Sequence, residues 1–339
     1  MGAVARKEAR GGRTGSGLRC QGCSHGREQA KFSRRRRVAS GPGLEALEGR
    51  RLLAANASQV AFREVTSNGA TALVITGTNR ADVIAIADDG TAAAGNVTVA
   101  LGDGTTYTSR AAISEVEVLG KGGDDQVSYR LTGDLNSYRA VLVDLGAGND
   151  QFSANLGGAV ANTDGLDLQV RGDSGNDNLA VNQSGATTAG TAFVYLEGDG
   201  GNDTITYHGN GAVASGAALV PGLSGGSGND TITSDYSGQV DGNYIYNLAS
   251  DGGAGNDVIA DSIALAAGST GTVGAAAGTP AAVLGGPGND QVRFSVVIDP
   301  SATQAQVNAL AVGGPGKDNV QRTANVQTDR SNEGDTVLS

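Results

Sequence analysis

The chain of 339 residues has no tryptophan and only 4% aromatic residues, whereas 55 residues are glycine. So few large side chains argue against a conventionally packed globular core. The composition is also not that of a disordered chain. Disordered chains have few apolar residues, but 39% of this chain is apolar, and those residues recur at fixed points of a period. The composition therefore favours a repeat protein.

Cysteine and histidine are scarce as well. Both cysteines, Cys20 and Cys23, lie near the N-terminus, so the rest of the chain has no disulfide framework. A structural zinc site needs four ligands, and His25 and His208 are the only histidines, so zinc is not expected. No run of 18 apolar residues occurs, and we predict no transmembrane helix. A dinucleotide-binding loop before a helix and an EF-hand loop are both absent.

Charge divides the chain near residue 51. Residues 1–51 carry 13 Lys and Arg against four Glu, whereas residues 52–339 carry 11 basic and 31 acidic residues, a net charge of −20. An acidic body attracts cations and repels nucleic acid and anionic membranes, so nucleic acid is not an expected partner. Residues 1–51 lack an apolar period, and we interpret them as a disordered basic export or sorting segment.

One glycine-rich motif returns eight times between Leu119 and Val320, at nearly even intervals apart from one longer interval between Asp257 and Asp290. In every copy a glycine stands two positions before the last acidic residue, an aspartate, and an apolar residue stands two positions after it. A further apolar residue stands seven positions before it in seven copies, and Ser250 is the exception. The pattern predicts a strand, a glycine-rich turn and a second strand.

The candidate metal ligands belong to these turns. The aspartates are Asp125, Asp150, Asp177, Asp203, Asp230, Asp257, Asp290 and Asp318. The glycines two positions before six of them are Gly148, Gly175, Gly201, Gly228, Gly255 and Gly288. The glycines five positions before five of them are Gly172, Gly198, Gly225, Gly252 and Gly285.

Two copies, Gly225–Thr233 and Gly285–Arg293, resemble most closely the calcium-binding nonapeptide of hemolysin-type (RTX) repeats, Gly-Gly-x-Gly-x-Asp-x-apolar-x. In that family two nonapeptides form one coil of a parallel β-roll. Calcium sits between the turns of successive coils, on turn carbonyls and the Asp carboxylate. The resemblance implies Ca²⁺ as the ligand of the turns here. This chain departs from the family in its longer repeat, with one motif in a period of three nonapeptides.

Such a period predicts a longer coil with one metal-type turn and two plainer corners. The expected fold is therefore all-β, a parallel β-solenoid of the β-helix or β-roll type, with its Gly-rich Asn-Asp turns stacked on one edge. Neighbouring rungs lie about 4.8 Å apart. Two carboxylates about 5 Å apart repel by roughly 3 kcal/mol at an effective dielectric near 20. A column of eight therefore calls for a cation, and Ca²⁺, which takes 6–8 oxygen ligands, suits it.

Near the N-terminus, the stretch Leu44–Ala55 resembles the Leu-Glu-x-Arg-x-Leu-Leu (LEPR-XLL) sorting segment of exported planctomycete proteins. Gly49 replaces the usual proline of that motif. The resemblance implies secretion or attachment to the cell surface. An ordinary short amphipathic helix is the alternative interpretation.

We expect four parts along the chain. They are the basic segment 1–51, an N-terminal β cap 52–117 with a degenerate repeat at Gly77–Ile84, the repeat solenoid 118–325, and a C-terminal tail or cap 326–339. A solenoid needs atypical terminal rungs because they cover the open ends of its core.

These features favour an exported, non-enzymatic calcium-binding protein that acts in cell-surface structure or adhesion. Its expected partners are calcium ions and a cell-wall or matrix polymer. One alternative is a lyase-like β-helix enzyme acting on polysaccharide, which needs a carboxylate pair on a groove away from the turns. Another is a disordered acidic passenger that only buffers cations. The turns themselves have a metal-free interpretation too, because ladders of Asn and Asp can cap solenoid corners.

Overall fold

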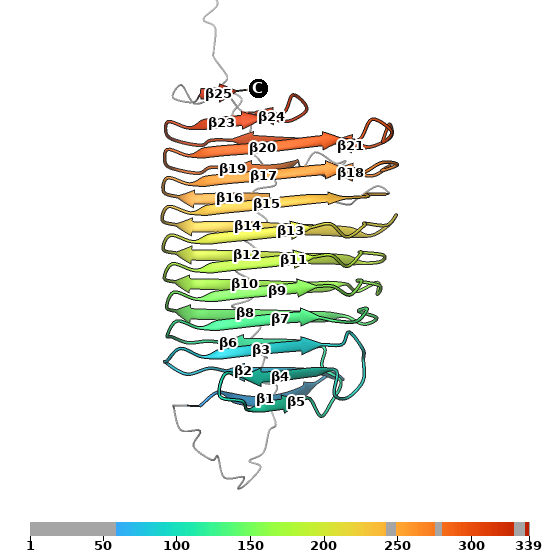
Figure 1. The fold of residues 1–339 in the computed structure, drawn as a ribbon, viewed down its shortest axis with the longest axis vertical. Helices are drawn as coiled ribbons and strands as arrows, with labels where there is room; N and C mark the ends of the chain where they lie inside the picture. Colours follow the sequence, from blue (N-terminus) through green and yellow to red (C-terminus); the bar gives the residue numbers. More distant parts are fainter. Residues whose placement is uncertain (1–58, 242–248, 275–279, 329–335, 339) are drawn as a thin grey trace, which may run out of the picture. The chain divides into compact units, whose positions relative to one another are not determined.

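The computed structural model describes residues 59–241, 249–274, 280–328 and 336–338 (Figure 1). The basic segment 1–51, with its resemblance to a sorting signal, lies outside these residues. Every regular element in the described ranges is a β-strand. The expectation of an all-β chain is confirmed. No helix in the described part is long and apolar enough to cross a membrane.

Most strands belong to two long sheets. Sheet A contains, in spatial order, β1 (Ala61–Ser67), β2 (Ala70–Thr76), β6 (Glu115–Leu119), β8 (Arg139–Ala147), β10 (Leu166–Ser174), β12 (Thr191–Gly200), β14 (Ala218–Ser227), β16 (Ala249–Ala254), β19 (Ala281–Leu284), β22 (Ala309–Val312) and β24 (Gln327–Thr328). Sheet B contains β25 (Thr336–Leu338), β23 (Asn319–Arg322), β20 (Gln291–Ile298), β17 (Val258–Leu265), β15 (Thr231–Gly238), β13 (Thr204–Gly209), β11 (Asn178–Gln183), β9 (Gln151–Leu156), β7 (Gln126–Leu131), β3 (Val83–Asp88), β4 (Val97–Leu101) and β5 (Thr106–Thr108). A short third sheet pairs β18 (Thr272–Val273) with β21 (Gln306–Val307).

Each coil contributes one strand to sheet A and the next strand to sheet B. Strands of successive coils pair in parallel and in step, as in Val170↔Leu196 of sheet A and Leu179↔Ile205 of sheet B. A third column of isolated parallel bridges connects the coils on their remaining side, through Leu135, Val160, Thr187, Val213 and Val240. The chain is therefore a parallel β-solenoid whose coils follow the period of the sequence motif, as predicted.

The core lies between the two sheets and follows the alternation of the strands. In β10 and β12 every second side chain is buried, and in β11 and β13 the apolar residues of the repeat point inward in the same way. Leu179 and Ile205, which follow the turn aspartates by two positions, have no exposed surface. Stacking places the same repeat position of each coil above its equivalent, so the core is a set of continuous apolar columns.

The first coil differs from the later ones. β1 pairs with β2, and β3 with β4 and β4 with β5, in antiparallel fashion. Beneath them the fully buried Arg139 guanidinium contacts the Asp88 carboxylate at 2.6 Å, and the Tyr129 hydroxyl donates to the same carboxylate at 2.8 Å. At the other end, β24 and β25 continue the parallel pairing beyond residue 325, so the stack extends into the expected tail.

Candidate metal centre

The eight aspartates lie in one column, at the edge where each strand of sheet A turns into the next strand of sheet B (left edge of Figure 1). The residue after each aspartate begins a strand of sheet B, and these residues are register partners, as in Asn178↔Thr204 and Thr204↔Thr231. From Asp125 to Asp290, the backbone N–H of each aspartate donates to Oδ1 of the aspartate in the next coil at 2.7–2.8 Å. We call this set the Asp column: Asp125, Asp150, Asp177, Asp203, Asp230, Asp257, Asp290 and Asp318.

The asparagines of the motif form a second ladder, which runs in the opposite direction. Here the side-chain oxygen accepts from the backbone N–H of the next coil, as from Asn202 to Asn176 and from Asn229 to Asn202, both at 2.7 Å. This Asn ladder is exposed, and it ends on Asp124 at one end and on the backbone of Lys317 at the other. The asparagines therefore have a complete role without any metal.

The glycine two positions before each aspartate is required by the stacking. At Gly175 and Gly201 φ is 138°, a left-handed conformation that favours glycine. A Cβ on Gly201 would overlap the carbonyl oxygen of Gly175 in the preceding coil. The same overlap with the preceding coil's backbone carbonyl would occur at Gly148, Gly175, Gly228, Gly255 and Gly288. These glycines let the turns approach closely, and this role needs no ion.

The glycine that stands five positions before seven of the aspartates leaves room for the carboxylate, and Leu145 takes its place before Asp150. A Cβ on Gly252 would lie 2.6 Å from Oδ2 of Asp257. Oδ2 of the turn's own aspartate also lies against the glycine at Gly172, Gly198, Gly225 and Gly285. A Cβ on Gly172 would in addition lie 2.7 Å from the carbonyl oxygen of Gly198 in the next coil. Each of these glycines therefore has a carboxylate oxygen of its own turn and a carbonyl oxygen of the next coil close to its Cα.

The carboxylates of the Asp column are out of contact with solvent, since no aspartate in it is more than 2% exposed. In the described part of the chain, Oδ2 of six of them is buried without a hydrogen-bond partner: Asp125, Asp150, Asp177, Asp203, Asp230 and Asp257. Burial raises the pKa of Asp125 and Asp177 to about 7 and that of Asp230 to about 6. The backbone N–H on Oδ1 lowers each pKa, and the neighbouring carboxylates of the column raise it further.

The donor atoms of the turns decide whether calcium fits them. All the donors are oxygens, which Ca²⁺ prefers, and a column of buried oxygens without partners lies beside glycines that have no side chain to fill the space. Among the described residues no three His, Cys, Asp or Glu side chains converge on one point. An ion in a turn would therefore draw several ligands from backbone carbonyls. With ligands drawn from both carboxylates and backbone carbonyls, the residues of the turns fit Ca²⁺.

The degenerate turn in the cap supports this interpretation, because there the protein satisfies the equivalent oxygens itself. Asp82 continues the column, and its N–H donates to Oδ1 of Asp125 at 2.8 Å. Its own Oδ2 accepts from the N–H of Thr78 at 2.6 Å. The Lys121 ammonium donates to the carbonyl oxygen of Gly77, the glycine five positions before Asp82, at 2.7 Å. A positive group thus occupies the oxygen-lined end of this turn.

Sequence reasoning missed a second buried polar group, inside the core. Ser234 and Asp261 are register partners in sheet B, and Ser250 belongs to sheet A. None of the three is more than 2% exposed, and neither Asp261 oxygen has a partner in hydrogen-bond geometry within the described residues. Burial raises the pKa of Asp261 to about 7, although the Ser250 hydroxyl and the Ser234 backbone lie close enough to lower it in part. The missing apolar residue at Ser250 was the signal for this group.

A third set of polar groups lies on the outer face of sheet A. Arg171 contacts Asp173 at 3.2 Å and Glu197 at 3.3 Å, and its guanidinium donates to Asp199. Burial and Asp199 raise the pKa of Glu197. Beside this acidic cluster, the rings of Phe193 and Tyr195 are stacked with centroids 6.3 Å apart. Asp173 and Asp199 stand inside two copies of the turn motif, and Arg171 and Glu197 occupy the position just before it, so the stacking of the motif could have indicated this cluster.

Comparison of the chain with known protein families, with curated proteins and with solved structures finds no match in any of the three.

Proposed function

We propose that the chain is an exported, non-enzymatic calcium-binding protein, whose stacked turns are held together by Ca²⁺ along the Asp column. The observation that carries the proposal is the row of buried Oδ2 atoms without partners in six successive coils. A buried carboxylate oxygen with no partner is costly, and the cost recurs in every coil. A cation at each turn would remove it.

Calcium accounts for the turns better than protonation does. A proton neutralises one carboxylate, whereas a divalent ion offsets the charge of two neighbours about 5 Å apart. The donor set contains only oxygen, and the glycines of the turn allow backbone carbonyls to take part. The Asp column would supply the carboxylates and the glycines the carbonyl ligands. Residues 52–339, with a net charge of −20, would also concentrate cations around the stack.

Such binding would couple folding to location. Extracellular calcium modules commonly bind at about 10⁻⁴–10⁻³ M. At lower concentrations the coils would repel one another at the turns, and at higher concentrations the bound ions would stabilise the stack. This behaviour suits a secreted or cell-surface protein in surface structure or adhesion, with a cell-wall or matrix polymer as its partner.

The test is calcium binding by the full chain, measured by calorimetric titration together with circular dichroism. We expect binding, and an increase in thermal stability on adding CaCl₂ that MgCl₂ does not reproduce, because Mg²⁺ demands a stricter geometry. In the double variant Asp203→Asn and Asp230→Asn fewer ions should bind. Asp164→Asn is the matched control, since Asp164 is an exposed loop residue outside the column.

The outcomes separate the proposals. Equal binding by the double variant and the control would remove the Asp column from the site. A chain without β signal at any calcium concentration would support the disordered passenger instead. A solenoid that is equally stable with calcium and with a chelator would support the metal-free ladder.

A polysaccharide-active enzyme is the second candidate, and the acidic cluster on sheet A is the observation that favours it. Glu197 directly precedes the turn glycine Gly198, and its raised pKa is a property of general acids. However, Arg171 contacts Asp173, Glu197 and Asp199 together, which holds these groups as ion pairs. Hydrolysis or elimination on acidic and neutral glycans, lost in Glu197→Gln, would establish this activity. Its absence would leave the non-enzymatic proposal.

A further inference from the structure

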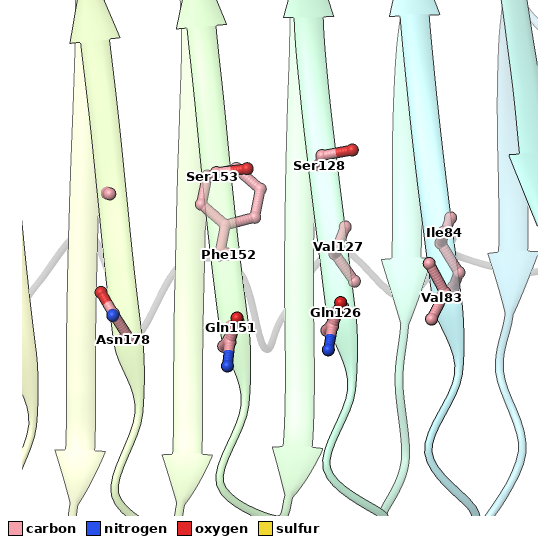
Figure 2. Close-up of a pocket in the computed structure, with 10 residues that line it drawn as sticks. Val83, Ile84, Gln126, Val127, Ser128, Gln151, Phe152, Ser153 and Asn178 are labelled. Carbon is pink, nitrogen blue, oxygen red and sulfur yellow. The ribbon is translucent and has the colours of Figure 1, made fainter. Parts of the chain in front are cut away.

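The outer face of sheet B carries a shallow trough of about 260 Å³, which crosses β3, β7, β9 and β11 (Figure 2). Gln126, Gln151 and Asn178 stand along one side of it, at the start of their strands (Figure 2). Ser128 and Ser153 lie beside them (Figure 2). The trough is therefore lined by side chains from several coils rather than by one loop.

The stacking of the coils explains the shape of the trough. The amides form one row, through Gln126↔Gln151 and Gln151↔Asn178. Two positions further along each strand, Ser128, Ser153 and Ala180 form a row of short side chains. A third row of longer side chains follows, made by Arg130, Asn155 and Asn182. The trough is lined by the row of amides and the row of short side chains beside it, and it runs across the strands, along the stack.

The amides of the trough have hydrogen-bonding capacity that the protein does not use. Each amide offers two donors and an acceptor. Gln126, Gln151 and Asn178 are exposed, and their side chains make no hydrogen bond among the described residues. The exposed Asn ladder at the turns differs in this respect, because each of its members accepts from the next coil. The amides of the trough are thus available to a ligand.

The charge of this face indicates the kind of ligand. The outward side chains of the strands β3 to β13 in sheet B include no carboxylate, although residues 52–339 carry 31 acidic residues. Arg130 is the one charged side chain in the three rows, so the face has no strong field that would select for an ion. The same pair of groups, an amide and a small residue, is present on three successive rungs, β7, β9 and β11, about 4.8 Å apart. A repeating, uncharged polymer matches such a face.

We propose that this trough binds an uncharged, hydroxyl-rich polysaccharide chain that lies along the stack, across β3 to β11. Amide side chains donate to and accept from sugar hydroxyls at the same time, and the row of short residues leaves space for the chain. Val83, which is 47% exposed at one end of the trough, offers an apolar contact to the C–H face of a sugar ring. None of these residues belongs to the Asp column, so the inference does not depend on calcium.

The experiment is affinity electrophoresis of the full chain through gels that contain a single polymer. The uncharged panel is xyloglucan, hydroxyethylcellulose, mannan, β-1,3-glucan and dextran, and polygalacturonate is the anionic comparison. We expect retardation by at least one uncharged polymer and none by polygalacturonate. The double variant Gln126→Ala and Gln151→Ala should bind that polymer about tenfold more weakly, because two hydrogen-bonding groups are lost.

Two further variants make the result specific. Ser153→Tyr fills the middle of the trough and should abolish retardation, whereas Gln291→Ala removes an exposed amide of the same row, far along the stack on β20, and should have no effect. Circular dichroism and calcium content of every variant are measured in parallel, so that a failure of the calcium proposal is visible separately. Absence of retardation by all five uncharged polymers, or equal weakening by Gln291→Ala, would overturn the inference.

Discussion

The two sheets are built by the same coils, but their outer faces differ in chemistry. On sheet A, the carboxylates of Asp173, Glu197 and Asp199 gather around Arg171. On sheet B, uncharged amides, hydroxyls and alanines occupy most outward positions from β3 to β13. The winding of the chain constrains the inward positions, the turn glycines and the Asp column, and it leaves the outward side chains unconstrained. The outward side chains can therefore vary, and they differ in chemistry between sheet A and sheet B.

The largest expected effect tests the constrained positions. Gly228→Val places a side chain against the backbone carbonyl of Gly201, at a φ of 135°. The backbone cannot separate there without breaking the stack, so we expect a loss of about 3 kcal/mol or more. Sheets A and B should unfold together, in a single transition, in chemical denaturation. Gly104→Ala, in a turn with open space around it, is the control and should cost about 1 kcal/mol.

The next largest effect concerns Asp261, an acidic residue at an inward position that is apolar in most other coils. Asp261 has a folded pKa of about 7 against an ordinary value of 3.8, so folding favours its protonated form. Its contribution to stability is present below about pH 4 and is lost as pH rises to about 7. Asp261→Asn removes this dependence, and at pH 8 it should stabilise the chain by about 2–3 kcal/mol.

The measurement is the free energy of unfolding of Asp261→Asn and of the parent chain at pH 5 and pH 8. Because the Asp column also titrates, only the difference between the two proteins is informative. A difference that is equal at both pH values would contradict the assignment of this buried acid.

A smaller effect compares the two faces directly. Arg171→Ala leaves the three carboxylates of sheet A to repel one another, and its side chain is only 26% exposed, so we expect a cost of about 1–2 kcal/mol. Arg293→Ala on the outer face of sheet B removes an exposed side chain and should cost close to nothing. Thermal unfolding at low and high salt measures both. Equal costs would mean that the faces are not electrostatically different.

The smallest effect separates the two ladders of the turn. Asn202→Ala removes one exposed acceptor from the backbone N–H of Asn229, and water can replace it. We expect a loss of about 0.5–1 kcal/mol and no change in calcium binding. If this variant loses calcium as Asp203→Asn is expected to, then the Asn ladder also takes part in the site.

Much of the architecture could be predicted from the sequence because it is encoded in a period. The apolar residues at fixed distances from each aspartate determine which side of each strand is buried, and the glycines locate the turns. A nearly constant repeat length then requires equivalent positions to stack, which is why the Asp column follows from the spacing alone. The spacing did not reveal that Oδ1 accepts a backbone N–H and leaves Oδ2 without a partner. That division depends on the path of the turn backbone.

The order of the residues specifies the local unit: strand, glycine-rich turn, strand, and the aspartate that ends each turn. The tertiary structure decided which side chains of different coils meet. Ser250 of sheet A and Asp261 of sheet B come together across the core, and Arg171 contacts Asp199, which stands at a different position of the next coil. The physical reason is that a period places equivalent residues one above another, whereas contacts between non-equivalent residues require the register of neighbouring strands and the packing of the two sheets.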